Sequence, residues 1–356
     1  MKSRDLSRLA LSACVAASML AGCGVLRQAQ DDMQPPIGTP GAIPQTSVIA
    51  AHADRGTSWM LPGAKSINRL LYLSNGSQAV YVYDYANGKQ VGELTGLNGT
   101  SGECVDARGD VYIANFTGGD VVEYARGGTK PLATYHTNGN AIGCAVDKND
   151  DLAAANLYDF SSSRPGALCL WKHGKGKATC YLGTGPCFYI YSPAYDDEGN
   201  VIFEGQGEIA TGVCAVLSGT SKITTLSYSG ASCCGGGVMW DGKYIAVTDL
   251  EVVGSSVQTT IAQATLSGST LTIRSETNLS DTCGVDGGVE VNAPFIVGVK
   301  NTPVNDKQGK VLIGGNLACE GSSGLEFWRY PKGGDSYRSV GGFVPSGEAV
   351  SLNPGR

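Results

Sequence analysis

Two glutamates, Glu103 and Glu348, occupy the same place in two copies of a short repeated pattern, each directly after a glycine. Further oxygen donors stand at or near the ends of β-forming runs, namely Asn115, Asn156, Asp249 and Asn316. Carboxylate and amide oxygens are the ligands that hard cations prefer. Asn and Asp after a strand also stabilise the following turn through their own side-chain hydrogen bonds, and this structural role is the main interpretation of the last four.

Ten cysteines follow Cys23 in the chain, and an even number in an exported protein favours disulfides. A zinc site is excluded because no pair of Cys-x-x-Cys knuckles occurs and the chain has only three histidines. Cys169 and Cys180 lie in successive β-type runs joined by the turn at 173–176, so this pair is predicted to bridge. The other pairings stay open; they involve Cys104, Cys144, Cys187, Cys214, Cys233, Cys234, Cys283 and Cys319.

Nothing in the chain predicts nucleophilic catalysis. No Gly-x-Ser-x-Gly motif is followed by a strand, turn and helix. His136 and His173 fall in loop or outer-strand contexts and are predicted to be solvated. The acidic stretches at 147–151 and 196–200 do not match a calcium-binding EF loop and are predicted to be hairpin turns.

The amino terminus reads as an export signal. Basic residues precede an apolar run at 9–20, which is too short to span a bilayer as a mature helix. The run ends in Leu20-Ala21-Gly22-Cys23, which resembles the lipobox of bacterial lipoproteins. The resemblance implies cleavage before Cys23, acylation of that residue (a palmitate-type chain) and, with Gly24 next, an outer-membrane location in the cell envelope. Residues 1–22 are thus predicted to be the signal peptide and 23–60 a lipidated, Pro- and Gln-rich tether.

Composition limits the function classes. Removing Lys2, Arg4, Arg8 and Asp5 with the signal peptide leaves 23 basic and 31 acidic residues, a formal charge of about −8. A mildly acidic chain without a basic run is not expected to bind nucleic acid. Residues 61–356 are long enough for one large β domain.

The elements that position these residues are short strands in a recurring unit. The stretch 111–151 holds four β-type runs, at 111–115, 120–124, 131–135 and 142–147, separated by Gly, Asn, Asp and Lys. The unit therefore predicts an antiparallel four-stranded meander. The second strand of each unit is expected at 70–75, 111–116, 152–157, 201–206, 244–249 and 310–316.

The first strand of each unit follows a Gly-rich or small-residue entry, at 102–106, 143–147, 192–196, 237–241, within 287–299 and at 347–351. The chain thus ends on a first strand and begins, after the tether, with a second strand. Pairing these two closes a ring, so we predict a six-bladed β-propeller of four-stranded blades. A seventh blade within 252–309 is the alternative.

The pattern Gly-x-x-Val-Asp, then Val-Tyr-Ile-Ala-Asn, then Val-Val-Glu-Tyr resembles NHL-type six-bladed propellers. The resemblance covers most of 70–352 and concerns the fold. Related lactonase-like propellers hold a calcium ion on the axis, which would make Glu103, Glu348 and the four Asn/Asp residues channel-lining candidates.

Aromatic residues gather in the third unit, Tyr158, Phe160, Phe188 and Tyr189 among them. Packing between blades explains most of them, and some are expected to line a carbohydrate or peptide groove. The expectation is a lipid-anchored module, without a cofactor, that binds a ligand or protein. The alternative is an axial-metal hydrolase of the lactonase type.

Overall fold

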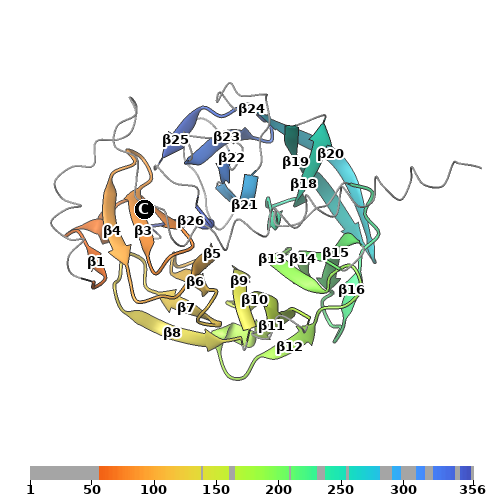
Figure 1. The fold of residues 1–356 in the computed structure, drawn as a ribbon, viewed down its shortest axis with the longest axis horizontal. Coiled ribbons are helices and arrows are strands. Elements are labelled where there is room, and N and C mark those ends of the chain that lie inside the picture. Colours follow the sequence, from red (N-terminus) through yellow and green to blue (C-terminus); the bar gives the residue numbers. More distant parts are fainter. Residues whose placement is uncertain are drawn as a thin grey trace, which may run out of the picture. The chain divides into compact units, whose positions relative to one another are not determined.

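Six small, mainly antiparallel sheets surround a common centre, with the innermost strand of each sheet nearest to it (Figure 1). This computed structural model describes residues 56–137, 139–159, 165–207, 210–230, 237–253, 256–280, 291–297, 310–316, 324–340 and 345–353. All of them belong to one compact unit, Ile43–Arg356. Within these ranges no helix is long and apolar enough to cross a bilayer. The predicted six-bladed propeller is confirmed.

Blades 1 to 3 are given from the innermost strand outward. Blade 1 contains β26 (Gly347–Leu352), β2 (Arg69–Ser74), β3 (Val80–Asp84), β4 (Gln90–Leu94) and β1 (Trp59–Met60). Blade 2 contains β5 (Thr100–Val105), β6 (Val111–Asn115), β7 (Asp120–Tyr124) and β8 (Pro131–His136). Blade 3 contains β9 (Gly139–Val146), β10 (Leu152–Asp159), β11 (Ala167–Trp171) and β12 (Thr179–Leu182).

Blades 4 to 6 follow the same plan. Blade 4 contains β13 (Tyr189–Tyr195), β14 (Val201–Gln206), β15 (Thr211–Val216) and β16 (Ile223–Thr225). Blade 5 contains β17 (Val238–Trp240), β18 (Ile245–Val253), β19 (Ser256–Ser267), β20 (Thr270–Ser280) and β24 (Gly334–Asp335). Blade 6 contains β21 (Val291–Val297), β22 (Lys310–Asn316), β23 (Leu325–Tyr330) and β25 (Arg338–Val340).

The ring closes as predicted. β26 pairs antiparallel with β2, from Arg69 opposite Leu352 to Ser74 opposite Gly347. The seven-blade alternative is wrong, because the segment after β18 forms the long hairpin β19–β20 of blade 5 and then β21 of blade 6. The run at 142–147 is the first strand of blade 3, so the meander predicted over 111–151 bridges two blades.

The core consists of six apolar clusters, one between each pair of adjacent blades. Alternate residues of one strand point to opposite faces of a sheet, so each blade packs against both of its neighbouring blades. In β2, Leu70 and Tyr72 pack toward blade 2, whereas Leu71 and Leu73 pack toward blade 6. All four side chains are buried, and each contributes about 2 kcal/mol of hydrophobic free energy.

In each of four blades, an aspartate stabilises the turn between the first and second strands. Asp147 Oδ1 accepts the backbone N–H groups of Asn149 and Asp151, and Asp196 Oδ1 accepts those of Glu198 and Asn200. Asp106 and Asp241 accept two backbone N–H groups in the same way. The hairpin-turn prediction for these acidic stretches is confirmed, and the recurring Asp has a structural role.

The predicted tether extends too far toward the propeller. Trp59 and Met60, placed at its end, form β1 and pair with Glu93 and Gly92 of β4. Gly92 makes this possible, because a Cβ built on it would lie 2.1 Å from the Met60 sulfur. Cys23, the signal peptide at 1–22 and the remaining tether up to residue 55 lie outside the described residues.

Candidate functional site

Close contacts between innermost strands shape the centre of the ring. A Cβ built on Gly347 would lie 2.5 Å from the Cα of Gly102 and 2.7 Å from Oε2 of Glu103. A Cβ on Gly143 would lie 2.4 Å from Oγ of Ser192 in blade 4. Glycine at these places lets neighbouring backbones approach, as the Gly-rich entries of the first strands predict.

Glu103 and Glu348 are brought together on neighbouring innermost strands, β5 and β26. They are 6% and 2% exposed and both line a central cavity of about 170 Å³. Oε1 of Glu103 accepts a hydrogen bond of 2.5 Å from the Ser74 hydroxyl. Oε2 of Glu103 and both carboxyl oxygens of Glu348 have no hydrogen-bond partner among the described residues.

Burial raises the pKa of both carboxyl groups well above the ordinary value, and the nearby charge of Glu103 raises that of Glu348 further. The bond from Ser74 offsets part of the effect on the Glu103 pKa. A buried carboxylate without a partner is costly, so each group is either protonated or in need of a cation or hydrogen-bond donor.

The rest of the cavity wall is mainly apolar. Val238, Met239 and Trp240 of β17 line it with Phe295 and Ile296 of β21. The disulfide between Cys104 and Cys144, which joins the innermost strands of blades 2 and 3, lies on the same wall. The glutamate pair is therefore a polar spot in a small, largely apolar chamber.

The three predicted channel asparagines do not line this cavity, and each bonds to a neighbouring segment. Asn115 accepts the backbone N–H of Asn98 and donates to Asp120 Oδ1 at 2.8 Å. Asn156 donates to the carbonyl oxygen of Thr137, and Asn316 donates to Glu326 at 3.5 Å. They do not line the cavity with the glutamate pair. Asn115 bonds across the turn that follows its strand, as the turn-stabilising interpretation predicts, whereas Asn156 and Asn316 bond to residues outside the turns that follow them.

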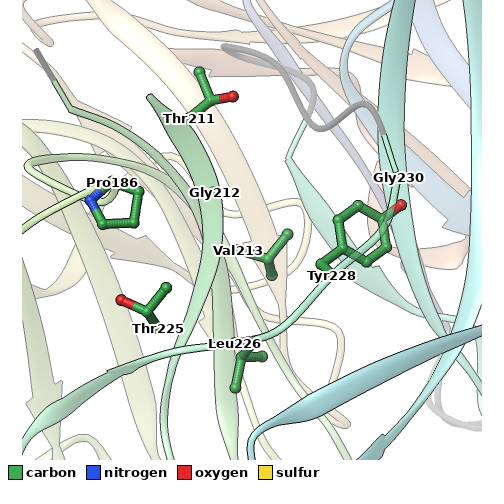
Figure 2. Close-up of a pocket in the computed structure, with 8 residues that line it drawn as sticks. All are labelled: Pro186, Thr211, Gly212, Val213, Thr225, Leu226, Tyr228 and Gly230. Carbon is green, nitrogen blue, oxygen red and sulfur yellow. The ribbon is translucent and has the colours of Figure 1, made fainter. Parts of the chain in front are cut away.

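Asp249 lies between blades 4 and 5, where its Oδ2 accepts a hydrogen bond of 2.7 Å from the Tyr228 hydroxyl. Gly230 leaves room for this bond, because a Cβ there would lie 2.3 Å from the hydroxyl oxygen. Tyr228 and Gly230 line a pocket of about 330 Å³ at the outer part of blade 4. Figure 2 shows Pro186 and Thr225 on one side of β15 there, and Val213, Leu226 and Tyr228 on the other.

No three His, Cys, Asp or Glu side chains of the described ranges gather closely enough to hold a metal ion. The oxygen donors predicted as a set thus separate into one glutamate pair and four residues placed elsewhere. His136 and His173 keep 76% and 69% of their side chains exposed, as predicted for solvated residues.

The structure contains three disulfides within the described residues. Cys169–Cys180 joins directly opposite residues of β11 and β12, as the hairpin predicts. Sequence reasoning missed Cys104–Cys144 and Cys187–Cys214. A signal for the former existed: the two cysteines are 40 residues apart, close to the repeat period, and follow the Gly of two first-strand motifs. Cys233, Cys234, Cys283 and Cys319 lie outside the described residues.

Three members of the predicted aromatic group, Tyr158, Phe188 and Tyr189, form a chain with Phe116 of blade 2. Phe116 packs edge to face with Tyr158, Tyr158 with Tyr189, and Tyr189 with Phe188, at centroid distances of 5.1–6.3 Å. All four rings are half-buried. Packing between blades, the first explanation of these residues, accounts for these contacts; Phe160 lies outside the described residues.

These features define a six-bladed β-propeller with an acidic pair at its centre. No protein-family model matches the chain, and no curated protein matches its sequence. Among solved structures, one from a nidogen/laminin complex aligns with a TM-score of 0.55 at 10% identity, covering 80% of this chain and 99% of that one. A Bacteroides caccae protein of unknown function aligns with a TM-score of 0.52, also at 10% identity and the same coverage. At this identity both likenesses concern the fold alone.

Proposed function

We propose that the protein is a lipid-anchored binding module of the cell envelope whose central cavity takes up a small group that is cationic or donates hydrogen bonds. One observation carries the proposal: both carboxyl oxygens of Glu348 are buried without a partner among the described residues, on the cavity wall. A ligand group that donates to them removes a penalty borne by the free protein, and that free energy contributes to binding.

The cavity limits the size of this group. At about 170 Å³ it is smaller than the pockets that enclose drug-sized ligands, which begin at about 300 Å³. A primary ammonium on a short chain fits its chemistry, because the charge faces Glu348 and Glu103 while the methylene part meets the apolar wall.

Calcium and a hydrolase based on it fit these residues less well. Calcium takes about six to eight oxygen ligands. Of the predicted set only Glu103 and Glu348 adjoin each other, and the described ranges hold no three-residue metal cluster. These donors therefore do not fit calcium, and we derive no metal-assisted step.

The channel proposal is tested by titrating methylammonium chloride into the purified protein by calorimetry, with sodium chloride and calcium chloride as matched salts. We expect methylammonium to bind and Glu348→Gln to weaken it about tenfold or more, the value of one charged hydrogen bond. Glu198→Gln, an exposed carboxyl in the blade 4 turn, is the matched control and should change nothing. Preference for calcium, or methylammonium binding no tighter than sodium, would reject the proposal.

Anchoring is tested separately at Cys23. The Leu-Ala-Gly-Cys sequence supports acylation there, and Gly24 supports an outer-membrane location. In a Gram-negative host we expect radiolabelled palmitate to enter the native chain and to be absent from Cys23→Ser. Unchanged labelling of the variant would place the lipid elsewhere, or show that the label is not specific.

A further inference from the structure

The outer edges of this propeller accept additional strands. In blade 1, β1 covers β4, with Trp59 opposite Glu93 and Met60 opposite Gly92. In blade 5, β24 covers the end of β20 in parallel orientation. A fifth strand has thus been added to two different blades, in blade 1 by the segment that precedes the first repeat and in blade 5 by the link between β23 and β25 of blade 6.

The outer strand of blade 2, β8, has no such cover within the described residues. With six residues it is the longest uncovered outer strand there, because β12 has four and β16 and β25 have three each. Its Leu132 is 56% exposed, and Thr134 and His136 are exposed as well. An exposed strand of this length is a template for pairing with another chain.

The backbone N–H and C=O groups of alternate residues of β8 point away from the blade. The N–H of Thr137 bonds to the carbonyl oxygen of Gly119 at 3.0 Å, so Thr137 faces the neighbouring strand β7. In an antiparallel ladder, residues alternate between facing the partner strand and facing away. Thr134 and His136, opposite Val122 and Asp120, therefore direct their N–H and C=O groups away from the blade.

Unpaired positive charge surrounds this edge. Lys130 directly precedes β8 and is exposed, as are Lys175 and Lys177 in the turn between β11 and β12. That turn lies close to the end of the Tyr135 side chain of β8, because a Cβ on Gly174 would be 3.1 Å from the Tyr135 hydroxyl. None of the three lysines forms an ion pair with a described residue.

The acidic groups nearby are already engaged. Asp150 pairs with Arg108, Asp151 with Lys172, and Glu123 accepts the Tyr135 hydroxyl. Asp120 accepts a hydrogen bond from Asn115. The edge therefore carries lysine side chains without an acidic partner among the described residues, in a chain that is acidic as a whole.

We infer that β8 is a docking edge for an extended acidic segment of a partner protein, which adds to blade 2 as a fifth strand. Main-chain hydrogen bonds to Thr134 and His136 supply the pairing, Leu132 supplies apolar contact, and Lys130, Lys175 and Lys177 select acidic side chains. The inference does not depend on the central cavity.

The experiment measures binding of a capped, fluorescent peptide of alternating valine and glutamate to the whole protein, with a valine–lysine peptide as counterpart. We expect only the glutamate peptide to bind, and more weakly at high salt. Thr134→Pro removes an outward N–H and should reduce affinity about tenfold or more. Lys130→Glu should also weaken binding severalfold.

Lys89→Glu is the matched control, because Lys89 is an exposed lysine directly preceding an outer strand, β4, that β1 already covers. It should leave peptide affinity unchanged. If Thr134→Pro lowers the melting temperature, its loss of affinity is not informative, and the comparison of Lys130→Glu with Lys89→Glu then tests the inference. Equal binding of both peptides, no binding of either, or equal losses in the two lysine variants would overturn the inference. The inference would also be overturned if the native protein bound anionic lipid vesicles but neither peptide, and Lys130→Glu abolished the vesicle binding.

Discussion

At the scale of single residues, the carboxyl group of Glu348 links stability to pH. Its pKa is raised by burial and by Glu103, so the folded state binds more protons than the unfolded chain. The contribution of this group to stability is therefore fully present below the unfolded carboxyl pKa of about 4.3 and is lost as the pH rises through the raised pKa of the folded state.

The variant Glu348→Gln cannot ionise at this position, so it should not lose stability in this way as the pH rises. We expect the variant to melt above the native protein at pH 8, by on the order of 2 °C for each kcal/mol recovered, and close to it at pH 4. Differential scanning calorimetry across that range measures the difference. Glu198→Gln, at an exposed turn, should show none. A variant less stable than the native protein at pH 8 would mean that the native carboxylate has a favourable partner.

Arg126 is a second residue whose role is local. Its guanidinium donates to the carbonyl oxygens of Lys65 at 2.8 Å, Ile67 at 2.5 Å and Ser351 at 3.5 Å. One side chain of blade 2 thus holds both the entry and the exit of the propeller chain. No pattern around Arg126 in the sequence indicates this, since its partners are backbone atoms 59 to 225 residues away.

Arg126→Met removes a charged donor from each of those carbonyl groups, so we expect a loss of about 2–4 kcal/mol in the free energy of unfolding. Arg274→Met is the control: Arg274 is exposed on β20, and among the described residues its guanidinium donates only to the Thr265 hydroxyl, at 2.9 Å, where a surface bond contributes little. Urea unfolding measures both. Similar losses in the two variants would contradict the assignment.

At the scale of elements, the disulfides differ in what they join. Cys169–Cys180 spans 11 residues of a hairpin that the ladder already holds, whereas Cys104–Cys144 spans 40 residues and joins two blades. The entropy removed from the unfolded chain grows with loop length, so the longer bridge contributes about 4 kcal/mol against about 3.

Replacing both cysteines of each pair with serine should therefore destabilise the protein more for Cys104 and Cys144 than for Cys169 and Cys180. The expected difference is about 1 kcal/mol from chain entropy. Guanidinium unfolding under non-reducing conditions gives the two values. The reverse order would show that native-state contacts, not loop closure, determine the contribution of the interblade bridge.

The second strands could be recognised from the sequence because each begins with apolar, β-forming residues and is bounded by turn residues, as at 111–116 and 201–206. All six second strands were predicted. Contacts between blades were less readable. The approach of Glu103 to Glu348 is an exception, because the predicted ring closure already places them in adjoining first strands. The separate environment of Asp249 depends on Tyr228 of another blade, which local pattern does not reveal.

At the scale of the whole molecule, stability depends on ring closure. Without β26, the strand β2 becomes the inner edge of blade 1, and Leu71 and Leu73 lose Val350 from the cluster that they form with blade 6. The closing strand also anchors blade 2, because the Ser351 hydroxyl donates to the carbonyl oxygen of Gly109 at 2.5 Å. A chain ending at Ser346 thus loses contacts in both neighbouring interfaces.

We expect this truncated protein to expose apolar surface, bind a hydrophobic dye and unfold at a clearly lower temperature than the full chain. A synthetic peptide of residues 345–353 should restore part of the lost stability in a concentration-dependent way, because only the folded ring offers the β2 edge that it pairs with. A scrambled peptide of the same composition is the control, since it lacks the alternation that places Glu348 and Val350 on one face. Equal rescue by both peptides, or a truncated chain as stable as the native one, would show that the other five blades hold together without closure.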